Sequence, residues 1–362
     1  MHCTLLFRYP RNNGGIFLML NNPGPGPRPS YTPENIDEKT QELYKESLVW
    51  DMTLPWVEGY ADENVTLPRF KAAGIDLISL TVNDFPGSIR GTMKQIAWVK
   101  DQIKRHDDMT LIATVDDIIT AKNSAQLALT LNLQETNPLE RSLDMVQVYY
   151  DVGVRHMLLA YNQKNFVGDG CADDTDAGLS LFGRQLIKEM NSVGMMVDGT
   201  HSGRRTTLEA MELTEKPFIF SHCCALGVAK HYRNITDEQI RACAATGGVI
   251  GVNGVGGFLI DKEARTELIF RHLDYMVELV GPQHLGIGWD YVKNVDAFWS
   301  AAKANPDAWP KNQNQSHVNC DNAQPEQILE LTQMMVNHGY QESDIQGILG
   351  QNFLRVATDI WL

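Results

Sequence analysis

The sequence predicts a single (β/α)8 barrel, and two observations support this fold class. From about residue 46 to the end of the chain, short apolar runs alternate with amphipathic helical stretches, with no break in composition. Apolar runs of this length are typical of parallel strands that are buried on both faces. Titratable residues also follow several of these runs directly, and active sites in such barrels are built at the carboxyl ends of the strands. A doubly wound open sheet produces a similar alternation, but no GxGxxG turn follows an early run.

Nine apolar runs compete for the eight strand positions of the barrel, so one of them is expected to lie outside it. In chain order they are 48–49, 74–82, 109–115, 127–133, 156–161, 195–198, 218–221, 248–252 and 285–288. Helical periodicity between and after them predicts helices over 92–105, 139–151, 181–193, 207–212, 236–246, 262–280 and 325–338.

The predicted domain organisation is an N-terminal arm or linker over 1–45 and one barrel domain over 46–362. The arm is rich in proline and glycine over 21–33, a composition typical of a flexible connection, and Met19 is an alternative start. A long segment over 292–324 follows the last predicted strand. Long loops at this end of a barrel often cover the substrate, so we expect it to cap the site.

Composition excludes several partner classes. The chain has 31 basic and 45 acidic residues, a net charge of −14, whereas binding to nucleic acid needs a basic face. No run of about 18 apolar residues occurs, so no membrane span or membrane partner is expected. The six cysteines match neither a CxxC zinc site nor a disulfide framework, which predicts reduced thiols and a cytoplasmic protein. A small molecule is the expected partner, and a homodimer is left open.

Three titratable residues come directly after three separate apolar runs: His201, His222 and Asp290. Neutral imidazole is the commonest protein ligand of zinc, and two imidazoles from neighbouring strands can converge on one ion. A carboxylate from a later strand can then take a proton from water that the metal makes acidic. A single histidine at a strand end is more often structural. Two histidines with an aspartate favour a metal-centred site.

Five segments, in this order, resemble motifs of the membrane dipeptidase (renal dipeptidase) family of zinc peptidases. They are 178–201 (GLSLFGRQLIKEMNSVGMMVDGTH), 218–234 (FIFSHCCALGVAKHYRN), 247–253 (GGVIGVN), 285–290 (LGIGWD) and 348–356 (ILGQNFLRV). The resemblance extends over about 46–360. It implies an amidohydrolase-type, metal-dependent TIM barrel with a two-zinc site.

The resemblance also implies roles for individual residues. His201 and His222 are expected to be ligands of one zinc. Arg233 is expected to bind the substrate carboxylate, which suits its bidentate guanidinium. Asp290 is expected to activate water and to pass the proton to the leaving amine.

The chain departs from the family pattern at the other zinc. The family's HxD motif becomes Asp51 and Thr53 if the following Leu-Pro-Trp is aligned, or Thr53 and Pro55 in the alternative register. Gln134 stands where the family has its bridging glutamate, and an amide is a weaker partner for a divalent ion than a carboxylate. Tyr161 stands where a family histidine contacts the substrate. Its hydroxyl can donate a hydrogen bond to an oxyanion.

We therefore expect a divergent, dipeptidase-like metallohydrolase that acts on a small carboxylate-bearing amide or dipeptide. At most one zinc ion is expected, weakly held or absent. Two alternatives remain open at this point. One is an enzyme of altered chemistry on the same barrel, such as a lyase, decarboxylase or lactone hydrolase. The other is a non-catalytic protein that binds a small molecule.

Overall fold

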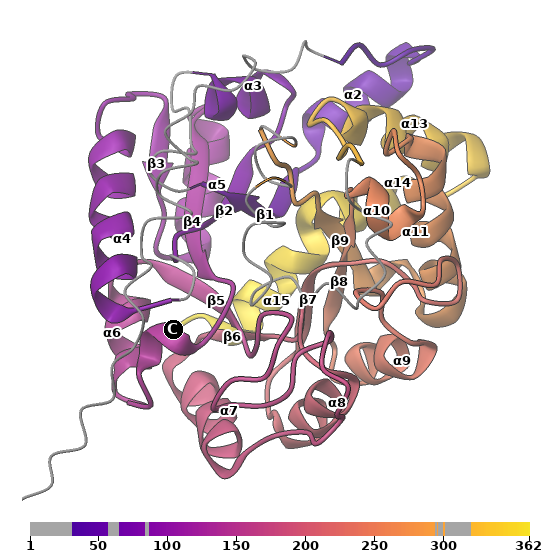
Figure 1. The fold of residues 1–362 in the computed structure, drawn as a ribbon. Coiled ribbons are helices and arrows are strands. Elements are labelled where there is room, and N and C mark those ends of the chain that lie inside the picture. The colour runs from indigo at the N-terminus through magenta and orange to yellow at the C-terminus, as the bar shows by residue number, and fades with distance from the viewer. Residues whose placement is uncertain (1–30, 57–64, 84–86, 294, 296–299, 301–319) are drawn as a thin grey trace, which may run out of the picture.

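The computed structural model describes residues 31–56, 65–83, 87–293, 295, 300 and 320–362, and its centre is a closed parallel barrel (Figure 1). Eight strands form the ring in the order β1-β2-β4-β5-β6-β7-β8-β9, with β1 pairing β9 and β2 pairing β4 directly. The predicted (β/α)8 fold class is therefore confirmed. The strands are β1 (Trp50–Pro55), β2 (Leu77–Thr81), β3 (Met109–Leu111), β4 (Leu127–Leu133), β5 (Val154–Leu158), β6 (Met196–Asp198), β7 (Ile219–Cys223), β8 (Val249–Asn253) and β9 (Leu285–Gly288).

The ninth strand is β3, which in the described part of the chain pairs only with the first half of β4. Strand β4 is long enough to take β3 and β2 near its start and β5 near its end. The first predicted strand, 48–49, is placed too early, because β1 begins at Trp50. Leu48 and Val49 are buried before the strand starts, so their apolar character reflects packing and not strand pairing.

Helices surround the ring, and their starts follow local capping rules. Ser88 and Ser180 accept backbone N–H bonds at the starts of α4 and α7, and Thr114 and Thr236 form capping boxes at the starts of α5 and α9. The helices are α2 (Glu38–Glu46), α3 (Thr66–Ala72), α4 (Ile89–Ile103), α5 (Val115–Asn123), α6 (Met145–Asp151), α7 (Leu181–Val193), α8 (Arg204–Leu213), α9 (Asp237–Ala245), α10 (Gly256–Leu259), α11 (Thr266–Val280), α13 (Gln327–His338), α14 (Glu342–Gln346) and α15 (Asn352–Ile360). Short 3-10 turns η1 (Asn137–Leu139) and η2 (Pro282–His284) and a π-helical segment η4 (Gly347–Gln351) complete the list.

Several of the predicted helices have different limits, among them 92–105 and 207–212, which are helical over 89–103 and 204–213, and part of the predicted arm is ordered. The stretch 139–151 becomes a helix only at Met145, because Glu140 and Arg141 adopt positive φ values that no α-helix contains. The stretch 262–280 becomes a helix only at Thr266. Within 1–45, helix α2 packs against α13, and Asp37 accepts a bond from the Thr40 N–H at its start. Residues 1–30 and most of the predicted capping loop, 292–324, lie outside the described residues.

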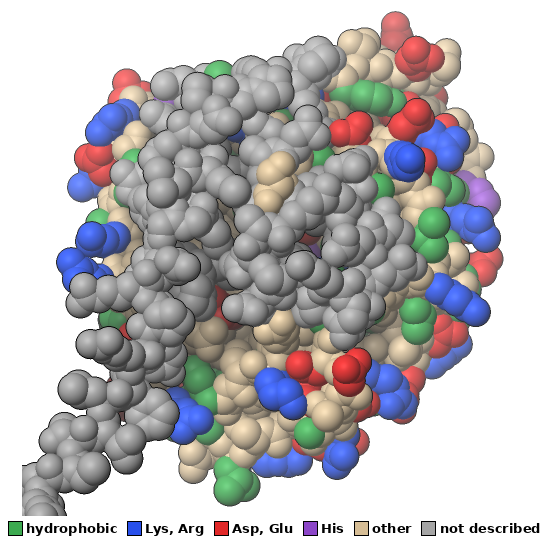
Figure 2. Space-filling view, viewed as in Figure 1, with side chains coloured by type: hydrophobic (Ala, Val, Ile, Leu, Met, Phe, Trp, Pro, Cys, Tyr) green, Lys and Arg blue, Asp and Glu red, His purple; other side chains and the backbone are tan. Residues whose placement is uncertain are grey.

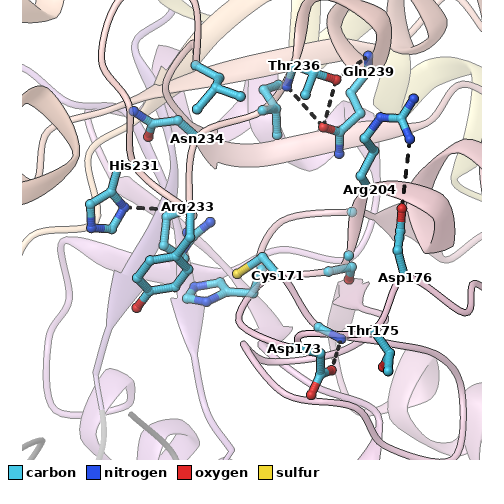
Figure 3. Close-up of a pocket in the computed structure, with 18 residues that line it drawn as sticks. Cys171, Asp173, Thr175, Asp176, Arg204, His231, Arg233, Asn234, Thr236 and Gln239 are labelled. Atoms are coloured by element: carbon cyan, nitrogen blue, oxygen red, sulfur yellow. Dashed lines mark hydrogen bonds and ion pairs between the residues drawn. The ribbon is translucent and has the colours of Figure 1, made fainter. Parts of the chain in front are cut away.

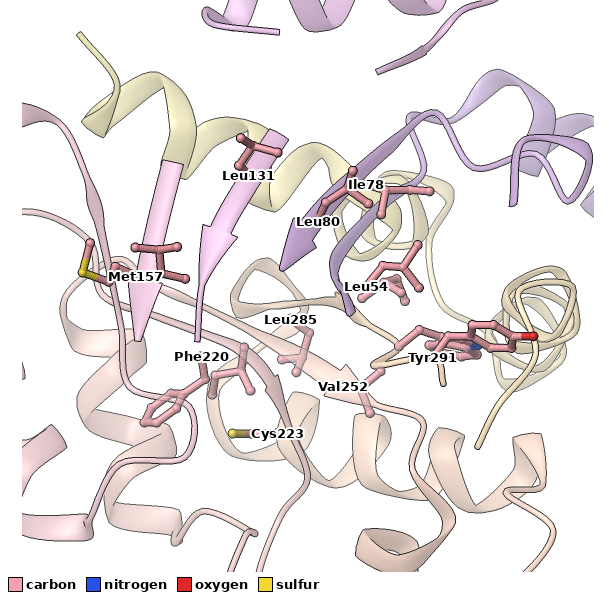
Figure 4. Packing of buried hydrophobic residues seen from close by; sticks show 14 of the residues in the cluster. Leu54, Ile78, Leu80, Leu131, Met157, Phe220, Cys223, Val252, Leu285 and Tyr291 are labelled. Carbon is pink, nitrogen blue, oxygen red and sulfur yellow. The ribbon is translucent and has the colours of Figure 1, made fainter. Parts of the chain in front are cut away.

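The interior of the barrel has an apolar floor. The first or second residues of six strands form one cluster with helix α15, which closes the amino-terminal end of the ring (Figure 1). They are Trp50, Leu77, Ala128, Met196, Ile219 and Val249. The leucines of β4, by contrast, belong with the larger cluster that packs against the surrounding helices (Figure 4). Burial on both faces explains why the strands appear in the sequence as continuous apolar runs.

Polar side chains form the layer above this floor. Ser79, Asn132, His156 and Asp198 are all buried and bond to one another, and the bond from Ser79 in β2 to His156 in β5 joins strands that are not neighbours. They therefore point to the barrel axis. The barrel thus has an apolar amino end and a polar carboxyl end, which is the end where such folds place their sites.

The described surface carries charges of both signs. Figure 2 shows Lys and Arg interspersed with Asp and Glu around the rim in this view. Within the described ranges, no helix is long and apolar enough to cross a membrane.

Candidate functional site

Two imidazoles meet at the carboxyl end of the barrel. Nε2 of His201, which follows β6, lies 3.1 Å from Nε2 of His222 in β7. The opposite nitrogens are engaged, with Nδ1 of His201 2.7 Å from Asn162 Oδ1 and Nδ1 of His222 2.8 Å from Ser221 Oγ. Because an amide oxygen only accepts, His201 carries its proton on Nδ1 and directs a lone pair from Nε2 toward His222. This arrangement of a second hydrogen bond behind the ring is typical of metal-binding histidines.

The backbone around this pair is tightly constrained. His201 has φ +67°, a left-handed conformation that costs a non-glycine residue about 1–3 kcal/mol and persists only where its surroundings hold it. Its carbonyl accepts the Cys171 N–H at 2.8 Å. On the other side, Gly251 and Gly288 let β8 and β9 approach the Ser221 carbonyl, since a Cβ on either would lie about 2 Å from that oxygen. The position of His222 therefore depends on two glycines in neighbouring strands.

Burial keeps both rings neutral. Loss of hydration lowers the pKa of His222 from 6.5 to about 4, helped by Arg233, while the Asp290 and Asp198 carboxylates oppose this shift. Burial first, and then Arg233 and His222, hold the pKa of His201 well below its ordinary value. Neutral imidazole is the form that binds metal, so the pair is in its ligand state near neutral pH.

Asp290 lies beside the pair. It follows β9 with φ +54°, and its Oδ2 lies 4.0 Å from Nε2 of His222 and accepts a bond from Asn253 Nδ2 at 3.3 Å. Asn322 donates to its backbone carbonyl at 3.1 Å. The structure thus brings the three residues predicted from the strand ends into one site.

Arg233 is buried, with 4% of its surface exposed, and its Nε and Nη2 atoms have no hydrogen-bond partner among the described residues. Its guanidinium lies 5.0 Å from the centre of the Phe258 ring. Buried guanidinium N–H groups without partners are costly unless an anion binds them. The arrangement therefore suits a carboxylate ligand.

Arg233 and His201 line the same cavity, of about 230 Å³ (Figure 3). Cys171 lies beside Arg233, and Asp176 and Arg204 line the cavity farther out. Burial raises the pKa of the Cys171 thiol to about 11, so this cysteine is no thiolate nucleophile near neutral pH.

Tyr161 stacks on His201, with ring centres 4.1 Å apart and planes inclined by 23°. Burial, followed by the charge of Asp290, raises the pKa of its hydroxyl far above the ordinary value of 10. The hydroxyl is therefore a permanent donor and not a base.

Asp51, Thr53 and Gln134 occupy the neighbouring part of the barrel mouth. Gln134 Nε2 donates to Thr53 Oγ1 at 3.3 Å and to Thr81 Oγ1 at 3.1 Å. Asp51 Oδ1 accepts the N–H groups of Trp289 and Thr53 at 2.8 and 3.2 Å, and its Oδ2 has no described partner.

This second half does not fit a zinc ion. Its amide nitrogen faces the threonine hydroxyls, where a metal would need an oxygen or nitrogen lone pair. Burial raises the pKa of Asp51 to about 7, so its carboxyl is half neutral near neutral pH. Among the described residues, no three His, Cys, Asp or Glu side chains form a ligand group.

Four residues that the sequence did not single out also shape the site: Asn162, Ser221, His156 and Asp198. Asn162 and Ser221 hold the outer nitrogens of the imidazole pair. Asn162 follows Tyr161 in the sequence, and Ser221 precedes His222. A polar residue next to a predicted site residue was the signal that could have identified both. His156 and Asp198 lie in the polar layer below, and nothing in a single sequence distinguishes them from core positions.

Comparison with known proteins identifies the family of this chain. Residues 58–306 match the family described as membrane dipeptidase (peptidase family M19). An "uncharacterized dipeptidase C965.12" of Schizosaccharomyces pombe is 31% identical over 212 residues, covering 56% of this chain and 51% of that protein. "Dipeptidase 3" of Mus musculus is 24% identical over 280 residues, covering 75% of this chain and 52% of that protein. The chain thus spans about half the length of these relatives.

A solved structure extends the match over nearly the whole barrel. An amidohydrolase from Pseudomonas aeruginosa superposes with a TM-score of 0.80 at 27% identity. The superposition covers 89% of this chain and 99% of that one.

Proposed function

Because the chain belongs to the membrane dipeptidase family, peptidase family M19, we propose that it is a dipeptidase-like, metal-dependent hydrolase. The proposed substrate is a small amide or dipeptide with a free carboxylate. We propose one zinc ion, held by His201 and His222. The observation that carries this proposal is the pair of Nε2 atoms 3.1 Å apart, with both outer nitrogens engaged.

The histidine half fits such an ion. Two nitrogens that each lie about 2.0–2.1 Å from a tetrahedral zinc are about 3.3 Å apart, close to the separation in this pair. When bound, zinc supplies Lewis-acid chemistry that makes water acidic enough to attack near neutral pH. Two protein ligands are fewer than zinc usually has in proteins, which supports weak binding and leaves coordination positions for water and substrate.

Three other residues are proposed to bind the substrate, transfer the proton and stabilise the oxyanion. Arg233 binds and orients the substrate carboxylate through its unpaired Nε and Nη2 atoms. Asp290 takes a proton at Oδ2 and returns it to the leaving amine, a role supported by its place 4.0 Å from His222. The Tyr161 hydroxyl, which stays protonated, donates to the developing oxyanion.

Zinc content and hydrolysis of a dipeptide panel test the proposal. Chelator-treated protein, reloaded with zinc, is expected to bind one ion per chain and to hydrolyse dipeptides but not their C-terminal amides. His201→Ala is expected to lose both properties. The matched control is His284→Ala, which removes a ring that bonds the Gly248 carbonyl at the opposite end of the barrel.

Other outcomes point to the alternatives. Two zinc ions per chain would contradict the single-ion proposal. Turnover without water addition, detected as a change in product mass, would indicate a lyase or decarboxylase. Ligand binding without zinc or turnover would indicate a binding protein.

The cellular setting and assembly are also proposals. A reducing, cytoplasmic location is supported by the described cysteines, none of which forms a disulfide. The proposed partner is a small-molecule substrate, and assembly into a homodimer is left as an open alternative. Protein mass in solution, measured by light scattering, tests the dimer.

A further inference from the structure

A continuous chain of hydrogen bonds crosses the interior of the barrel below the site. It starts at Gln134 Nε2, which donates to Thr81 Oγ1 at 3.1 Å, and Thr81 Oγ1 donates to Asn132 Oδ1 at 2.9 Å. Asn132 Nδ2 then donates to Ser79 Oγ at 2.9 Å. All four side chains are buried.

The chain continues to a carboxylate. Ser79 Oγ lies 2.9 Å from Nε2 of His156, and Nδ1 of His156 lies 3.1 Å from Oδ2 of Asp198. His156 and Asp198 are 1% and 0% exposed, so water does not compete for these bonds. The path links β4, β2, β5 and β6.

The two ends of the chain fix its direction. Gln134 presents an amide N–H, which only donates, and an ionised Asp198 only accepts. Ser79 accepts from Asn132, and its own hydroxyl proton is available for Nε2 of His156. With the chain donating in this direction, His156 donates from Nδ1 to Asp198 and accepts at Nε2. Every link donates the same way, from Gln134 to Asp198.

Asp198 connects this chain to the imidazole pair. Its other oxygen, Oδ1, accepts the backbone N–H of Thr200 at 2.9 Å and that of Ser221 at 3.2 Å. These residues immediately precede His201 and His222. One carboxylate therefore ties together both strand ends that carry the rings, including the left-handed backbone at His201.

We propose that the chain from Gln134 to Asp198 is a positioning device for the two imidazoles, with His156 as its key positioning residue. Since Nδ1 of His156 holds Oδ2 of Asp198, Oδ1 stays directed at the two backbone N–H groups. The amide at 134 suits this device, because it supplies the donor that starts the chain. A carboxylate there would supply only acceptors and would bury a second negative charge. The inference rests on the proposed function in one respect only, namely that the rings of His201 and His222 bind zinc.

The first test needs no variant. In ¹⁵N-labelled, metal-free wild-type protein, the imidazole spectrum is expected to show His156 protonated on Nδ1 only. A proton on Nε2 of His156, or a doubly protonated ring, would overturn the proposed direction of the chain. This outcome is independent of whether zinc binds or any substrate is cleaved.

The second test breaks the chain at His156. His156→Leu is expected to shift the ring resonances of His201 and His222 in the metal-free protein. It is also expected to weaken zinc binding about 10–100-fold, as loss of a residue behind a metal ligand typically does. His156→Gln should restore most of the affinity, because its amide can donate to Asp198 and accept from Ser79. His284→Gln is the matched control and should change neither property.

The possible results separate this inference from the proposed function. If His156→Leu folds and leaves both ring resonances unchanged, the positioning role is wrong even where zinc binds. If the wild type binds no zinc but the resonances shift as expected, the positioning role stands and the single-zinc proposal fails. If His156→Leu does not fold, the wild-type tautomer and His156→Gln still decide the question.

Discussion

The two halves of the barrel mouth differ in what their polar atoms face. In the histidine half, the Nε2 atoms of His201 and His222 face each other, and Nε and Nη2 of Arg233 have no partner among the described residues. In the other half, Gln134 donates into the hydroxyls of Thr53 and Thr81. The first half leaves polar atoms without a partner among the described residues, whereas the second half satisfies most of its own. Side chains that bond to one another can thus fill part of a barrel mouth without a charged ligand.

The largest expected effect is on catalysis by the histidine half. Asp290→Asn should lower kcat about 10²–10⁴-fold, because the amide cannot take the proton at this position. Its oxygen can still accept from Asn253, so zinc content and the unfolding midpoint should stay unchanged. Steady-state kinetics and metal analysis check this. The exposed Asp359→Asn is the control, and a kcat for Asp290→Asn equal to wild type would remove Asp290 from the mechanism.

The next effect separates binding from stability at Arg233. Arg233→Met should cost roughly 2–5 kcal/mol of preference for a dipeptide over its C-terminal amide. It should also raise the free energy of unfolding by at least about 1 kcal/mol, because a buried unpaired charge is removed. Ratios of kcat/KM and urea unfolding measure the two quantities.

Arg155→Met is the matched control for that experiment. Arg155 is also buried, but its guanidinium donates to the carbonyls of Ala113, Tyr150 and Val154. Its loss should therefore destabilise the protein. If both variants change stability in the same direction, Arg233 has a partner of its own in the folded protein.

The third prediction probes the other half through pH. Burial raises the pKa of Asp51 from 3.8 to about 7, so between these values the folded state binds a proton that the unfolded state releases. The contribution of this group to stability is present below about pH 4 and is lost as pH rises through 7. The shift corresponds to roughly 4 kcal/mol at most. Asp51→Asn should therefore gain stability over wild type from pH 5 to pH 8.

Unfolding by urea at several pH values, without metal, measures this difference. Asp359→Asn should show no comparable pH dependence relative to wild type. A constant difference between Asp51→Asn and wild type would mean that Asp51 stays ionised in the folded state, and that this half is more polar than its contacts indicate.

The smallest expected effect concerns a variant that gives the second half a carboxylate at position 134. Gln134→Glu supplies the carboxylate that the family has there, but Thr53 and Asp51 still do not provide the HxD ligands. We expect no second zinc and a loss of about 1–3 kcal/mol of stability, because the new carboxylate is buried without a cation. Metal analysis and urea unfolding test this. The exposed Gln283→Glu should be neutral, and a second bound zinc in Gln134→Glu would show that one residue separates the halves.

Much of the histidine half could be predicted from local sequence. His201, His222 and Asp290 each follow an apolar run, and strand ends of a parallel barrel meet at one edge. The other half, with Asp51, Thr53 and Gln134, could be predicted only as a departure from the family motif. That Gln134 bonds Thr53 and Thr81 depends on strands β4, β1 and β2 lying side by side, which no periodicity specifies.

The limits of local prediction are visible in the fold as well. Helix α7 was predicted at the limits observed, and in the structure a serine cap and a glycine mark its ends. Strand β1 and the start of α6 were misplaced. Their apolar residues are buried by contacts distant in sequence, and burial alone does not distinguish a strand from the turn before it.

By itself, the sequence determined the alternation of strands and helices, the barrel, and the residues that stand at the strand ends. These features follow from hydrophobic periodicity and capping, which act over a few residues. Only the tertiary structure decided which polar atoms face one another. The Nε2 atoms of His201 and His222 converge, Nε and Nη2 of Arg233 have no partner among the described residues, and His156 joins the site through Asp198. Each of these depends on directions and distances across the barrel, which are fixed only when the ring closes.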